Sequence, residues 1–85
     1  MRNIGNIDAI LGELERMFND RIDFARMLFG AHGQTELFEK RLNECGEKLK
    51  EKVADEPKED QPFLILMYKS HFAEMCMTRY LLKKQ

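Results

Sequence analysis

Residues 62–84, PFLILMYKSHFAEMCMTRYLLKK, carry the most informative pattern of the chain and predict a long helix. Pro62 suits the first turn of a helix, because its missing N–H group would have no intrahelical partner there. At 100° per residue, four polar side chains share a sector about 100° wide: Ser70, His71, Glu74 and Thr78. Apolar side chains occupy an arc of roughly 220°, about twice what a surface helix needs. We therefore expect a second copy of the chain to cover part of this arc.

Candidate binding residues come from this helix and from the apolar residues before it. The chain holds six methionines and six phenylalanines, which suit an adaptable apolar pocket but more often form core. His71 either contacts a ligand's polar end or forms a solvated pair with Glu74. The candidate ligand-binding residues are Phe24, Leu28, Met67 and His71. The candidate dimer-interface residues are Tyr68, Phe72, Met75 and Cys76. Periodicity fixes the apolar arc but not which half is core and which half is interface.

Three further helices are predicted, at about 6–19, 21–29 and 34–53. The first has apolar residues at helical spacing, and Asn19-Asp20 marks a break because both side chains compete for backbone hydrogen bonds. The second ends at the turn Gly30–Gly33, where glycine supplies positive φ cheaply. The charged stretch 54–61 predicts a solvated loop. We therefore expect one all-α domain over residues 1–85, with four helices and the 62–84 helix at its centre.

Composition excludes several classes of function. Fourteen Lys and Arg residues against fifteen Asp and Glu give a net charge of −1, without the basic surplus of a nucleic-acid-binding module. The apolar run Phe63–Tyr68 is far shorter than the roughly 20 residues of a membrane span. Cys45 and Cys76 are expected to be reduced thiols of a cytoplasmic protein. No catalytic, metal-binding or cofactor motif is present, so we expect neither an enzyme nor a cofactor.

The stretch 21–42 resembles the regulatory domain of TetR-type transcriptional repressors. In many of these a short helix ends in an LL-G-x-x-G turn, and the next helix opens with x-x-F-x-x-x-L. Leu28-Phe29-Gly30-Ala31-His32-Gly33 occupies the place of that turn, and Phe38 and Leu42 occupy the two apolar positions. Residues 78–82 resemble the aromatic end of the penultimate helix of that family. The resemblance implies a bacterial homodimer in which a small apolar effector enters between helices and biases their spacing.

Two elements of that family are missing from this sequence. The basic helix-turn-helix would precede Met1, and the last helix of the dimer surface would follow Gln85. The chain is then either a fragment or a naturally shortened relative. DNA binding would require the absent N-terminal domain, and the sequence identifies neither the effector nor an operator. The expected function is therefore ligand sensing and dimerisation for a transcriptional regulator.

Two alternatives remain from other functional classes. The first is a small helical homodimeric interaction module without a ligand cavity. The second is a chorismate mutase, because Ile7-Asp8 followed by Arg21 is faintly similar to the opening of the all-helical members of that family. Such an enzyme needs several cationic side chains converging on a dicarboxylate, and the sequence does not assign them.

Overall fold

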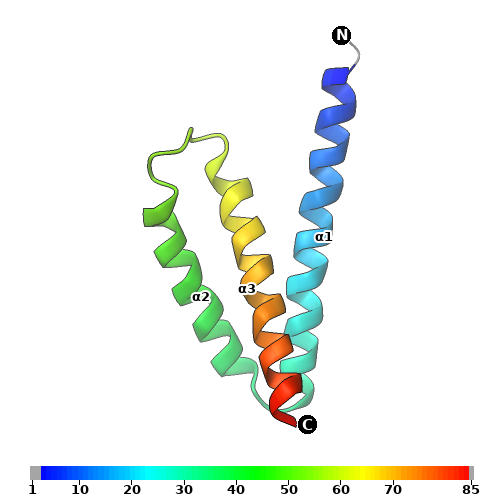
Figure 1. Cartoon of the computed structure of the whole chain (residues 1–85), viewed down its shortest axis with the longest axis vertical. Coiled ribbons are helices and arrows are strands. Elements are labelled where there is room, and N and C mark those ends of the chain that lie inside the picture. The colour runs from blue at the N-terminus through cyan, green and yellow to red at the C-terminus, as the bar shows by residue number, and fades with distance from the viewer. Residues whose placement is uncertain (1–2, 85) are drawn as a thin grey trace.

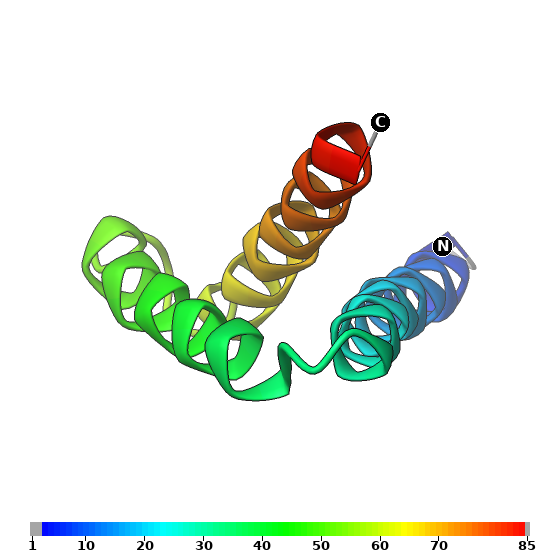
Figure 2. The ribbon, with the colours of Figure 1, turned by 90° about the horizontal axis from the view of Figure 1, so that it is seen from below.

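The computed structural model describes residues 3–84, which form three helices and no strand (Figure 1). The helices are α1 (Asn3–Ala31), α2 (Thr35–Lys52) and α3 (Gln61–Lys84). The chain descends through α1, returns along α2 and descends again through α3, so α1 and α3 run in the same direction (Figure 1). Seen from below, α1 and α2 lie on either side of α3 (Figure 2). The predicted all-α class is confirmed.

The prediction of four helices was wrong, because α1 continues through the expected break at Asn19-Asp20. The Asn19 side chain does not cap a new helix; its Nδ2 donates a hydrogen bond to the backbone oxygen of Glu15 at 3.1 Å. The apolar face of α1 also runs through this point without a change of phase. Its half-buried and buried members are Leu14, Phe18, Ile22, Ala25 and Phe29. Burial of one unbroken face therefore outweighs the local preference of two cap-forming residues.

The turn between α1 and α2 lies where the glycines predict it. Gly33 has a φ of 71°, in the left-handed region that glycine enters without steric cost. The backbone N–H groups of His32 and Gln34 both donate to the carbonyl oxygen of Phe29, at 3.2 and 2.8 Å. These bonds satisfy a carbonyl that the end of α1 would otherwise leave without a partner. Gly30 itself still belongs to α1.

The core is small and takes residues from all three helices. Its buried cluster is Ile22, Ala25, Phe38, Leu42 and Ala73. Ala25, Ala73 and Ser70 have no exposed area, so short side chains let these two helices approach closely. Phe18 contacts Phe63 of α3 edge-on, with ring centroids 5.7 Å apart.

The molecule is elongated for its length. Its radius of gyration is 15.0 Å, against about 12 Å for a compact chain of this size. The first turns of α1 extend past the start of α3 and the end of α2 (Figure 1). Most apolar side chains of α1 before Phe18 are exposed: Ile7, Ile10, Leu11 and Met17.

Candidate functional site

A groove of about 300 Å³ lies between α2 and α3, beside the C-terminal end of α1. Its apolar wall is formed by Phe29, Leu37, Phe38, Phe72, Cys76 and Tyr80. We call this site the aromatic groove. Phe29 and Phe38 stack with ring centroids 5.1 Å apart, and Tyr80 meets Phe29 edge-on at 5.3 Å. The turn at Gly33 makes this possible, because it folds Phe38 back against the last turns of α1.

Helical spacing brings the α3 side of the groove together. Phe72, Cys76, Tyr80 and Lys83 recur at intervals of three or four residues, so they share one face of the helix. On α2, Leu37 and Arg41 stand one turn apart at the opposite edge. The groove is therefore aromatic at its base and cationic at its rim.

The rim carries three positive side chains and no acidic one: Arg41, Arg79 and Lys83. Within the described part of the chain, none of the three has a carboxylate within ion-pair distance. Arg79 and Lys83 lie four residues apart on α3, where like charges repel. Among the described residues, no carboxylate pairs with this rim.

Burial raises the pKa of the Cys76 thiol above its ordinary value, and the positive charges of Arg79 and Arg41 oppose that rise only in part. Burial also raises the pKa of Cys45. Both residues are therefore thiols at neutral pH, whereas a cysteine nucleophile needs its thiolate form.

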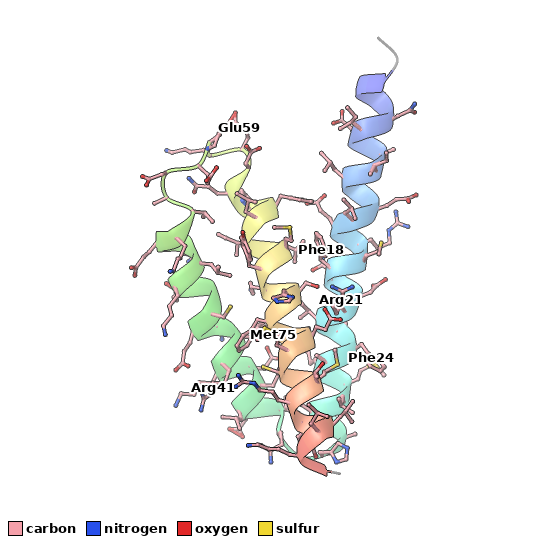
Figure 3. The ribbon with its side chains drawn as sticks, in the orientation of Figure 1. Phe18, Arg21, Phe24, Arg41, Glu59 and Met75 are labelled. Atoms are coloured by element: carbon pink, nitrogen blue, oxygen red, sulfur yellow. The ribbon has the colours of Figure 1, made fainter. Side chains whose placement is uncertain are left out.

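The four residues expected to bind a ligand do not line the aromatic groove. Phe24 is 61% exposed and points away from α2 and α3, whereas Phe18 points toward α3 (Figure 3). Leu28 and Met67 are half-buried. His71 is exposed in a shallow depression beside Glu74. These four candidate ligand-binding residues therefore lie outside the aromatic groove.

Glu74 pairs with α1 rather than with His71. Its Oε1 lies 3.5 Å from Nη1 of Arg21, and the same nitrogen donates to Oγ of Ser70 at 3.5 Å. Ser70, one of the four side chains of the polar sector on this helix, is fully buried. The reason is that α1 packs against this side of α3. Arg21, on which the chorismate-mutase resemblance depends, lies outside the groove.

The expected interface residues divide into two pairs. Tyr68 and Met75 are exposed, as a dimer contact requires. Phe72 and Cys76 are half-buried and line the aromatic groove. Sequence periodicity placed all four on one arc, but the position of α2 decides which of them it covers.

Two rows of apolar side chains recur at the heptad spacing of a coiled coil, interrupted by Arg21 on α1 and by His71 and Thr78 on α3. Their members are exposed or half-buried. The α1 row is Ile10, Leu14, Met17, Phe24 and Leu28; the α3 row is Leu64, Tyr68, Met75 and Leu82. In the α1 row Ile10, Met17 and Phe24 are 57%, 54% and 61% exposed. Neither row forms the base of the aromatic groove.

No family model matches the chain, and searches among curated proteins and solved structures find no match either. Over residues 3–84, no group of three or more potential metal-ligating side chains is found. None of the helices described combines the length and the apolar character that a membrane span requires. Function is therefore inferred from the groove and the two exposed rows.

Proposed function

We propose that this chain is a helical interaction module that functions as a homodimer. The observation that carries the proposal is the large exposed surface of the single chain. Its accessible area is 6659 Å², whereas a compact protein of this mass exposes roughly 5,300 Å². The excess of roughly 1,400 Å² is more than the roughly 800 Å² that each partner contributes to a standard interface.

The α1 row is the proposed contact. Its 4-3 spacing is that of a helix seam that inserts side chains between those of a facing helix. Ile10 and Met17 of this row are more than half exposed, so pairing would remove their apolar side chains from water. The proposed partner is a second copy of the chain, because it carries the same apolar row and the two rows can cover each other. The net charge of −1 adds little repulsion between copies.

Sedimentation velocity of Met17→Glu and Phe24→Glu tests this contact. Both side chains are more than half exposed, so a carboxylate there leaves the monomer fold intact while placing a charge in the seam. We expect the wild type to sediment as a dimer and both variants as monomers. Asn43→Glu is the matched control, because it adds the same charge at an exposed position of α2. A monomeric wild type, or dimeric variants, would contradict the proposal.

A second candidate function is the ligand-sensing and dimerisation domain of a TetR-type regulator. The turn favours it, because Gly33, with its φ of 71°, occupies the position of the second glycine in the resemblance. An all-helical fold with a groove between helices suits such a role. The test is the coding sequence upstream of Met1. A basic helix-turn-helix in frame would support this candidate. An unrelated upstream sequence would reject it and leave the interaction module as the proposed function.

A further inference from the structure

We propose that the aromatic groove binds a small organic anion with an apolar body, such as an aromatic carboxylate. The inference is independent of the homodimer, because the groove and the α1 row lie on different faces of the helices. It depends on two features of the same site, the aromatic base and the positive rim.

The base fits a flat apolar body. Phe29 and Phe38 stack on each other with an interplanar angle of 13°. The half-buried rings of Phe29, Phe72 and Tyr80 line the groove and are the ones that a ligand would contact. Aromatic groups prefer offset or edge-on contact with such rings. A volume of about 300 Å³ is at the lower end of small-molecule sites, which indicates a ligand of one or two rings.

The rim fits a negative charge. Arg41 approaches from α2 and Arg79 from α3, and the positive charges of both act on Cys76 at the base of the groove. A guanidinium presents paired N–H donors that match the two oxygens of a carboxylate. A bound anion would also relieve the repulsion between Arg79 and Lys83 on one face of α3. Apolar contact and charge pairing would thus act on opposite ends of one ligand.

A second depression also has positive side chains, but it lacks the aromatic base and the arginines of the aromatic groove. It lies beside the loop between α2 and α3, and its cations are Lys50, Lys58 and Lys69. No aromatic side chain lines it, and Lys50 is already paired with Glu47 at 3.1 Å. The combination of rings with two guanidinium groups that pair with no described carboxylate therefore favours the aromatic groove.

The test is a titration of the ¹⁵N-labelled full chain with 1-naphthoate and with its uncharged analogue 1-naphthamide. We expect naphthoate to shift the amide signals of Phe38, Arg41, Cys76 and Arg79, with a dissociation constant of about 1 mM or lower. Naphthamide should bind about tenfold more weakly, because it lacks the charge. Equal affinity for the two probes, or shifts confined to the exposed rows, would overturn the inference.

Substitution of the arginines at the rim separates recognition of the ligand's charge from nonspecific apolar binding. The double variant Arg41→Gln, Arg79→Gln should bind naphthoate about tenfold more weakly, with naphthamide unchanged. Arg16→Gln removes an exposed positive charge from α1, outside the groove, and should leave both affinities unchanged. An unchanged naphthoate affinity in the double variant, or the absence of saturable binding in the wild type, would refute the site. Sedimentation of the same samples reports the dimer separately.

Discussion

Gly33→Ala is predicted to destabilise the fold through its backbone alone. A Cβ atom at this position would meet nothing within 4 Å, so no side-chain clash contributes. The cost comes from the φ of 71°, which places a Cβ too close to the following carbonyl oxygen. That conformation costs about 1–2 kcal/mol for a residue with a side chain. Gly33→Asn should cost less, because asparagine tolerates this region better than alanine.

Gly12→Ala is the matched substitution with the opposite expected sign. Gly12 lies inside α1, is exposed, and also has nothing within 4 Å of an added Cβ. An alanine in a helix interior is more favourable than glycine by about 1 kcal/mol, because glycine loses more backbone entropy on folding. The same chemical change should therefore stabilise the chain at position 12 and destabilise it at position 33.

Urea unfolding followed by circular dichroism measures both effects, at one fixed protein concentration because dimerisation contributes to stability. We expect the midpoint to rise for Gly12→Ala and to fall for Gly33→Ala, with unchanged slopes. A stable Gly33→Ala variant would show that the turn does not adopt the left-handed conformation. A neutral or destabilising Gly12→Ala would show that α1 is not helical around position 12.

Two further predictions concern the core and the groove. Phe38→Ala should lower the free energy of unfolding by about 3–5 kcal/mol, because Phe38 is buried and stacks on Phe29. Urea unfolding measures this loss, and a value well below about 1 kcal/mol would exclude this packing. The raised pKa of Cys76 predicts that its alkylation by iodoacetamide reaches half its maximal rate at a higher pH than in an unfolded peptide with the same local sequence. Because the folded pKa is the higher one, the stability contributed by the protonated thiol is lost as pH rises through that value. A Cys45→Ser background isolates the signal, and a rate profile equal to that of the peptide would contradict burial of Cys76.

Local signals in the sequence predicted the positions of the turns. Gly33 and Pro62 restrict the backbone directly, so the predicted helices at 34–53 and 62–84 agree closely with α2 and α3. The predicted break at Asn19 was wrong because the preference of this residue for a cap is also local. The structure overrides that preference through a core face that continues from Leu14 to Phe29.

The position of the groove depended on tertiary packing and was not predictable from periodicity. Ala25 and Ala73 let α1 approach α3 on the side that carries Ser70, which buries this one member of the polar sector. Arg79 and Lys83 share a helix face in the sequence, but Arg41 joins them only because α2 folds back along α3. The site is therefore a product of helix order and helix contact rather than of a motif.

Amide hydrogen exchange along residues 7–17 tests most directly whether a second copy covers this N-terminal part of α1. In an isolated chain this segment has few buried contacts and should open easily. The homodimer predicts that its amides are protected and that their protection increases with protein concentration. Rapid exchange at every concentration, alongside protected amides in α3, would contradict it.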